Sequence, residues 1–540
     1  MEYACQLFHP QSNLTILLHF PKTLDFTKQP QQWEEQIFIC TLIVKKVFIL
    51  LGFWRTNDHF QSCLIEKLTS IASHSPFSVL EYETAISKAL ILDLNPLYWV
   101  IAPLYSKTGR PSQNQPEIFR SLVLMNDLGY SLDEWVHSKL PNNLVLQAAC
   151  GFFDGKLPAI ASYYDFINRI VKLDEKPRHK HKKRKPTKKY GKQKLPPKHP
   201  NITARLVEKI LAGRRLNNRP ERVLQQIFAD VCVSRSIEMG LVPQSISISG
   251  DGTCIETGAS RYGVKTCECR SYNCQCPRKF SDPNASWGWD SHNERYFYGY
   301  TGYFISTYNK AEKLDLPLYL RLVGASRHDS VSAVVALAEF RDLYPGLRID
   351  SFISDSASDN YATYTLLKAW GINAVIALAE RGDFKYPPHL NINEHGAPVC
   401  IGGHVMAYWG KCPDRDRLKW RCPFKLGNVK ECSSSGSCSP SAYGRTIYTS
   451  PKWDLRLFTG IPRGSDEWKS KMNERTAAER VNNRILHHYG IESSKTRSKK
   501  RISFFVTIAA FNIHLDAQIA KAKELDPLGF NAVIGISKAA

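Results

Sequence analysis

Apolar residues recur at helical spacing in the stretch between residues 109 and 170. Pro116 stands in the first turn of one such pattern, Ile118, Leu122 and Met125 follow at intervals of three or four, and Gly129 ends it. The spacing predicts an amphipathic helix with one buried face.

Two further helices are predicted in the same stretch. Ser131 and Glu134 form a capping box that opens the second helix, and the third begins near Ser162. Residues 77–174 are therefore expected to form a helical domain, either a DNA-binding domain or a purely structural bundle. Residues 1–76 show little regular pattern and are left as an unassigned leader.

The pattern changes to strands after residue 240. Following a helical stretch at 204–240, Ser245–Ser249 alternates polar and apolar residues as a half-buried strand does, and Gly250-Asp251-Gly252-Thr253 is expected to end it. A second strand is expected at Ile349–Ser354, directly before Asp355. A helix at 361–370 and a strand at 374–378 complete a strand–helix–strand order, which predicts an α/β core at residues 201–515 and a tail at 516–540.

Positive charge is concentrated in one segment. The 540 residues include 72 Lys and Arg against 50 Asp and Glu, a net charge of +22. Residues 176–200 alone hold ten Lys and two Arg with no acid, and their prolines exclude a continuous helix. We expect residues 175–200 to be a flexible basic linker that neutralises nucleic-acid phosphates; the alternative is a solvated linker whose charges merely repel.

Composition excludes several classes of protein. An apolar share of 43% excludes a wholly disordered chain, and 15 cysteines in 540 residues are too sparse for a disulfide scaffold. No secretory signal is recognised, and the apolar stretch Ile37–Trp54 carries Lys45 and Lys46 near its centre, which makes a membrane span unfavourable. We therefore expect a cytoplasmic protein with reduced cysteines.

Three carboxylates follow or flank predicted elements. Asp251 and Asp355 each follow an expected strand, and Glu479 lies at the edge of the apolar stripe Ala478, Val481 and Ile485. Carboxylates gathered at one point repel one another unless divalent cations neutralise them, and oxygen ligands suit Mg²⁺ or Mn²⁺. On spacing alone, an ordinary turn or surface position is the favoured interpretation of each acid.

Four segments together resemble the DDE transposases of bacterial insertion sequences. They are Ser249-Gly250-Asp251-Gly252-Thr253; Phe297-Tyr298-Gly299-Tyr300 with Leu316-Pro317-Leu318 and Arg327-His328-Asp329-Ser330; Ile353-Ser354-Asp355-Ser356-Ala357-Ser358-Asp359; and Arg475-Thr476-Ala477-Ala478-Glu479-Arg480. The helical region 109–170 is also similar to the N-terminal domain of these enzymes. The resemblance implies an RNase H-like catalytic core and a transposase that cleaves phosphodiesters and transfers strands at inverted-repeat ends.

The resemblance also implies roles for particular residues. Asp251, Asp355 and Glu479 become the catalytic triad and the ligands of Mg²⁺ or Mn²⁺, with Glu474 and Asp359 as competitors for their sites. DNA-contact candidates are Arg475, Arg480, Lys182, Lys183 and Arg184. The implied partners are double-stranded DNA, comprising terminal repeats and target, and a second copy of the chain in a dimer or larger complex. The implied location is the bacterial cytoplasm, at the nucleoid.

The sequence departs from the family pattern at Thr301, Ser358, Met472 and Leu486. These departures leave the carboxylates in place but affect residues that position DNA ends. There are three alternatives to an active transposase. They are a decayed transposase that binds DNA without cutting it, a stand-alone RNase H-like nuclease and a zinc-dependent regulator.

Two groups of cysteines could hold structural zinc. Cys267, Cys269, Cys274 and Cys276 form a C-x-C-x4-C-x-C pattern, and a Cys-rich insertion is expected at about 395–445. The candidate ligands of that insertion are Cys400, Cys412, Cys422 and Cys432. Reduced loop cysteines are the alternative for both groups.

Overall fold

The computed structural model describes residues 51–172 and 201–525, except residues 107, 218, 273, 275, 292 and 380–383, and it also describes the backbone of 179–180. The chain divides into two compact units: Met1–Phe53 with Tyr105–Gln113, and Trp54–Leu104 with Asn114–Ala540. Most of the first unit lies outside the described residues, as do Lys182, Lys183 and Arg184 and most of the apolar stretch Ile37–Trp54. All that follows concerns the second unit.

The N-terminal part of this unit is helical, as its apolar spacing predicts. Its helices are α2 (Asn57–Ala72), α3 (Pro76–Glu81), α4 (Glu83–Ile91), α5 (Asn95–Ile101), η2 (Ala102–Leu104), α6 (Gln115–Asp127), α7 (Leu132–Glu134), η3 (Trp135–Lys139), α8 (Leu144–Cys150) and α9 (Ile160–Ile170). Ser131 caps α7 through Glu134 N, and Gly129 adopts φ +75° after α6. Helix α2 lies in the leader that the sequence left unassigned, so the compact unit starts about twenty residues earlier than expected.

The central sheet is mixed and has the order β7-β6-β2-β8-β9, with β5 pairing with β6 on the edge opposite β2, next to the end of β7. Its strands are β2 (Ser245–Glu256), β5 (Ser286–Asp290), β6 (Arg295–Asn309), β7 (Leu314–Gly324), β8 (Arg348–Ser354) and β9 (Asn373–Ile376). Strands β5, β6, β7 and β2 pair antiparallel, whereas β2, β8 and β9 run parallel. The expected α/β fold class is therefore confirmed.

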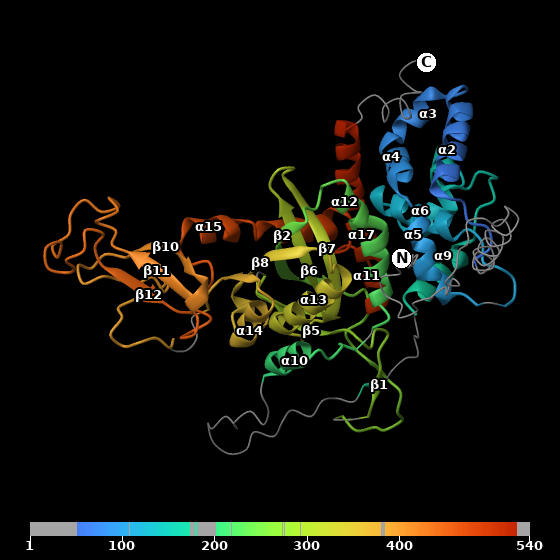
Figure 1. Ribbon diagram of the computed structural model, residues 1–540. Coiled ribbons are helices and arrows are strands. Elements are labelled where there is room, and N and C mark those ends of the chain that lie inside the picture. The colour runs from blue at the N-terminus through green and yellow to red at the C-terminus, as the bar shows by residue number, and fades with distance from the viewer. Residues whose placement is uncertain are drawn as a thin grey trace, which may run out of the picture. The chain divides into compact units, whose positions relative to one another are not determined.

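Helices cover both faces of this sheet (Figure 1). They are α10 (Ile202–Leu211), α11 (Arg222–Phe228), η4 (Ala229–Val233), α12 (Ser234–Glu238), α13 (Asp329–Leu343), α14 (Tyr361–Ala369), α16 (Thr476–Asn483), η7 (Arg484–His488) and α17 (Lys499–Leu525). Helices α10, α13 and α14 share the apolar contacts of Val207, Val334 and Leu366. Helix α16 packs on β2, β6 and β7.

Helix α17 joins the helical part to the sheet. It packs against β7 on one side and against α4 and α6 on the other. Lys88 Nζ of α4, buried, pairs with Asp127 (2.5 Å) at the end of α6 and with Asp516 of α17 (2.7 Å). The helix continues to Leu525, across the expected tail boundary at residue 515, and apolar residues such as Ile519 still pack beyond that boundary.

Within the described residues, α17 is the one unbroken helix long and apolar enough to cross a membrane, and 78% of its apolar window is buried inside the protein. The bent pair α4 and α5–η2 passes the same test of length and composition only if both helices are taken together. The apolar side chains of α17 are thus already covered by protein.

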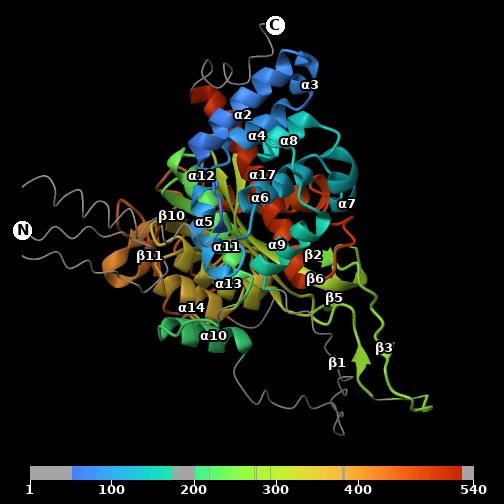
Figure 2. The ribbon, with the colours of Figure 1, turned by 90° about the vertical axis from the view of Figure 1, so that its right-hand side faces the viewer.

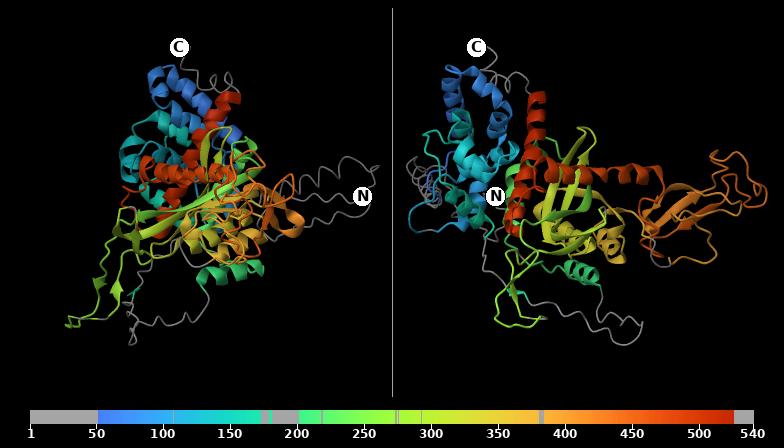
Figure 3. Two further views of the ribbon diagram at one scale, coloured as in Figure 1. Left: turned by 90° about the vertical axis from the view of Figure 1, so that its left-hand side faces the viewer. Right: turned by 180° about the vertical axis from the view of Figure 1, so that it is seen from behind.

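Two smaller sheets carry the cysteines. Strands β1 (His179–Lys180), β4 (Arg278–Lys279) and β3 (Val264–Lys265) form an antiparallel arm (Figure 2), so two residues of the expected linker are in a strand. Strands β10 (Ala407–Cys412), β11 (Arg417–Arg421) and β12 (Thr446–Thr449), with η6 (Pro413–Arg415), form a separate antiparallel sheet (Figure 3). Helix α15 (Asp466–Asn473) follows it and packs on β8 and β9.

Candidate active site

Asp251 lies inside strand β2, not after its end. The flanking glycines indicated a turn, but β2 continues to Glu256 and pairs with β6 on one side and, up to Ser249, with β8 on the other. Gly250 and Gly252 are needed in this strand because a larger residue would not fit. A Cβ on Gly250 would collide with the Tyr303 hydroxyl, and a Cβ on Gly252 would lie 2.8 Å from Asp329 Oδ1.

Asp355 stands beside Asp251 because of strand register. Ser249 and Ile353 are the last partners in the parallel β2–β8 ladder; Asp251 lies two residues further along β2, and Asp355 directly follows the end of β8 at Ser354. Neighbouring strands lie about 4.8 Å apart, so the two residues come near one another just beyond the ladder. The Asp355 carboxylate also caps η5 (Ser356–Ser358), where its Oδ1 accepts the Ala357 N–H at 3.2 Å.

The charge of Asp355 acts on Asp251. Burial and then the neighbouring Asp355 charge raise the pKa of Asp251 from 3.8 to about 6, against the lowering effect of Arg475. Burial and Asp355 likewise raise the pKa of Asp329. Asp251, Asp355 and Asp329 are called the Asp251 cluster below, because their charges interact although their ligand atoms do not gather within 4.8 Å of one another.

Asp329 is the member of this cluster to which the sequence assigned no role. It begins α13 on the opposite face of β2 from Asp251, and it reaches the cluster because Gly252 has no side chain. The sequence feature that could have indicated this residue is the segment Arg327-His328-Asp329-Ser330. That segment was part of the family resemblance, but no role was assigned to its aspartate.

Tyr303 lies between these acids on β6. Its side chain is 1% exposed, and its hydroxyl lies near the Ser354 hydroxyl, which donates to Ser358 Oγ at 2.8 Å, without a well-formed hydrogen bond of its own. Burial, and then Asp329, Asp251 and Asp355, raise the pKa of Tyr303 well above its usual range. The phenol stays neutral and can donate a hydrogen bond into the carboxylate cluster.

Glu479 lies on α16, the helix that covers Asp251. Its carboxylate is 49% exposed and pairs with Arg475 Nη2 at 2.6 Å. One turn further on, Asn482 Nδ2 donates to Asp251 Oδ2 at 3.0 Å. The apolar residues Ala478, Val481 and Ile485 are buried as expected, which fixes this face of the helix against the sheet.

The three predicted metal ligands do not converge to ligand distance of one another. Among the described residues, one group of three or more Cys, His, Asp or Glu ligand atoms gathers within 4.8 Å, and it consists of cysteines. Arg475 instead supplies the local positive charge, since it holds Glu479 and lowers the pKa of Asp251.

The competing acids have other roles. Asp359 is buried and accepts hydrogen bonds from Arg456 Nη2 at 2.6 Å, Tyr364 and Ala379 N, so it forms a buried ion pair and does not cap a helix. The cap of α14 is Asn360. Burial raises the pKa of Glu474, whose neighbouring charges are Lys471, Lys310 and Asp350. Neither acid belongs to the Asp251 cluster.

Arg480 is not a free basic side chain. It forms a bidentate pair with Asp315 at 2.5 and 2.7 Å, and its Nη1 donates to Thr476. A DNA contact by Arg480 would therefore compete with this ion pair.

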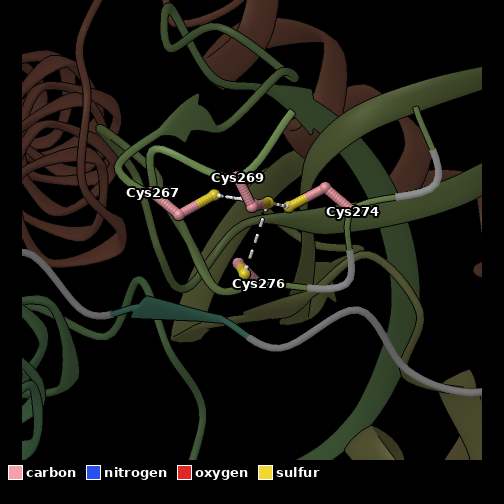
Figure 4. Close-up of side chains that lie close together, drawn as sticks. All are labelled: Cys267, Cys269, Cys274 and Cys276. Atoms are coloured by element: carbon pink, nitrogen blue, oxygen red, sulfur yellow. Dashed lines mark hydrogen bonds between the residues drawn. The ribbon is translucent and has the colours of Figure 1, made fainter. Parts of the chain in front are cut away.

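The four cysteines between β3 and β4 do come together (Figure 4). Cys267 Sγ lies 3.3 Å from the sulfurs of Cys269 and Cys274, Cys269 lies 3.0 Å from Cys274, and Cys276 lies 3.8 Å from Cys269. A hydrogen bond from Cys269 lowers the pKa of Cys274 to about 6. Four sulfurs bound tetrahedrally to zinc at about 2.3 Å lie about 3.8 Å apart, so this cluster could hold a metal such as zinc.

The second set of cysteines is not gathered in this way. Cys400 packs against the small core of the β10–β12 sheet, Cys422 is buried near Gly444, and Cys432 lies near Gly402. The described residues therefore place one metal-ligand cluster where the sequence predicted two.

No protein-family model matches this chain, and no curated protein is significantly similar to it in sequence.

Proposed function

We propose that this chain is a transposase of the DDE type, which uses divalent metal to cut phosphodiesters and join strands at the ends of a DNA element. The observation that carries the proposal is the placement of Asp251 within β2 and of Asp355 directly after the neighbouring parallel strand β8, where the Asp355 charge helps to raise the pKa of Asp251. A sheet with antiparallel strands followed by two parallel ones, and carboxylates on its central strands, is the arrangement expected of an RNase H-like core.

The donor set suits Mg²⁺ or Mn²⁺. Asp251, Asp355 and Asp329 offer oxygen ligands that repel one another, and such oxygens favour hard cations. When bound, the cation would neutralise this repulsion and acidify a water or a DNA 3′ hydroxyl. The Tyr303 hydroxyl would donate to one carboxylate, and Asn482 would keep Asp251 oriented.

Glu479 completes the proposed site only if it leaves Arg475. Their ion pair is half exposed, and such pairs contribute about 0–1 kcal/mol, so a bound cation or a DNA phosphate can replace it. Arg475 would then be free to contact the phosphate. The basic linker and the N-terminal helices would hold the rest of the DNA.

The test is cleavage of a plasmid that carries the DNA flanking the gene, with Mg²⁺ or Mn²⁺. The wild-type protein is compared with Asp355→Asn, which removes one charge at the site, and with Asp165→Asn, which removes one exposed charge on α9. We expect cuts and joined products at the repeat ends with wild type and Asp165→Asn, and none with Asp355→Asn.

Other outcomes separate the alternatives. Binding by all three proteins without any cutting favours a decayed copy. Cutting without end preference or joining favours a nuclease. Cutting by Asp355→Asn equal to wild type would refute the assignment of the site.

A further inference from the structure

The sheet β10–β12 has one apolar and one polar face. Leu418 and Trp420 of β11 pack with Ala397 and Met406 into a small core. Because side chains alternate along a strand, Arg417, Lys419 and Arg421 point to the opposite face. Tyr448 of β12 pairs with Lys419 and joins them on that face.

This face is strongly basic. Residues 384–453 hold ten Lys and Arg against four Asp and Glu. Arg417, Lys419 and Arg445 have no ion pair with a carboxylate of the described residues. Three cations held near one another without counter-charge favour a polyanionic partner.

Exposed aromatic rings are interleaved with these cations. Arg421 lies 4.1 Å from the ring centre of Trp409 and 5.3 Å from that of Tyr443. Trp409 is 51% exposed and Tyr443 is 70% exposed. Such rings offer flat faces on which unpaired bases can stack, whereas paired bases inside a duplex cannot reach them.

A hollow of about 830 Å³ opens along the edge strand β12. Arg415, Arg417, Arg445 and Lys452 line it, together with Tyr448, His389 and Trp453, and no carboxylate lies in its wall. Pockets of this size accommodate a small ligand, and a nucleotide turned out of a base stack fits within this range.

We propose that the β10–β12 insertion is a binding site for single-stranded DNA, separate from the Asp251 cluster. Arg417 and Arg445 would contact phosphates, and Trp409 and Tyr448 would stack on unpaired bases. This site rests on the proposed function only in that its partner is DNA, because an unpaired strand arises when an element's end is opened for cutting.

The experiment measures fluorescence anisotropy of a labelled single-stranded oligonucleotide, in competition with unlabelled duplex of the same sequence. Magnesium is left out, so a chain without cleavage activity gives the same readout. The variants of the full chain are Arg417→Ala with Arg445→Ala, Trp409→Ala and, as a charge-matched control, Arg214→Ala with Arg215→Ala in the loop after α10.

For the arginine pair we expect the salt slope for single strands to fall by about 1.4, which corresponds to about 25-fold weaker binding at 0.1 M salt. Trp409→Ala should weaken binding at least about fivefold. The control pair should change neither the preference for single strands nor the affinity by a comparable factor. A double Arg→Lys variant at positions 417 and 445 should keep most of the binding, which excludes misfolding as the cause.

Equal binding by wild type and the arginine pair would overturn the proposal. So would an arginine pair that weakens binding of the duplex as much as it weakens binding of the single strand. Loss of plasmid cleavage with these binding preferences intact would instead count against the proposed catalysis alone.

Discussion

Replacing Asp251 by Asn should make the folded chain more stable at neutral pH. Burial and Asp355 raise the pKa of Asp251 from 3.8 to about 6. The ionised carboxylate is thus disfavoured in the folded state relative to the unfolded chain. The penalty is absent below pH 3.8, grows as the pH rises toward 6, and is complete above it.

The magnitude follows from the same values. A difference of 2.2 pKa units at about 1.4 kcal/mol each gives about 3 kcal/mol. Asp251→Asn keeps the shape of the side chain and an oxygen that can still accept from Asn482. The variant should therefore gain up to about 3 kcal/mol at pH 8 and about half of that at pH 5.

The assay is urea unfolding followed by tryptophan fluorescence at pH 5 and pH 8, without added metal. Asp165→Asn, an exposed aspartate on α9, is the control for loss of one negative charge and should change stability at neither pH by more than about 0.5 kcal/mol. Saturating MgCl₂ should stabilise wild type more than the variant, because the cation binds the charged site only. A variant that is less stable than wild type at pH 8, or a gain that is equal at both pH values, would refute the reasoning.

Four further predictions concern the same contacts. In the metal-free chain, Asp329→Asn should shrink the stability gain of Asp251→Asn at pH 8, because it removes a charge that raises the pKa of Asp251; an unchanged gain would exclude Asp329 from the site. Zinc analysis of the purified chain should find one equivalent, which Cys267→Ser loses and Cys412→Ser keeps; two equivalents would show that the second set of cysteines also binds metal. Lys88→Ala should cost about 3–5 kcal/mol because it leaves Asp127 and Asp516 without their buried partner, and Lys88→Met with Asp127→Asn should recover part of that loss in the same unfolding assay. His514 is buried, and its pKa is lowered from 6.5 to about 4. It therefore costs no stability above pH 6.5, but below that pH it destabilises the folded chain increasingly, by up to about 3 kcal/mol near pH 4. His514→Gln should lose less stability in acid than wild type, and an equal loss of stability would contradict the burial of a neutral His514.

The order of elements could be read from the sequence with fair success, because helices and strands leave local patterns. The helices at Gln115–Asp127 and Tyr361–Ala369 and the strand at Arg348–Ser354 follow directly from spacing, capping residues and glycine stops. The Asp251 strand shows the limit of this reading. Gly250 and Gly252 indicate a turn by local propensity, yet pairing with β6 on one side and β8 on the other keeps the chain extended.

Two segments pack beyond the domain boundaries expected from the sequence, and for the same reason. Helix α2 and the last ten residues of α17 each bury apolar side chains, such as Phe60 of α2 and Ile519 of α17. These side chains can be assigned to the core only when the elements they pack against are known. Propensity alone gives no reason to extend a domain to these segments, whereas packing does.

The candidate site was likewise only partly predictable from the sequence. The sequence by itself determined which acids and cysteines were available, where the charge is concentrated, and that Asp355 ends a strand. Only the tertiary structure decided that Asp329 joins Asp251 and Asp355, that Arg475 holds Glu479, and that four of the eight candidate cysteines gather. These contacts join residues far apart in the chain, and they depend on strand register and on the space left by Gly252, which no local pattern encodes.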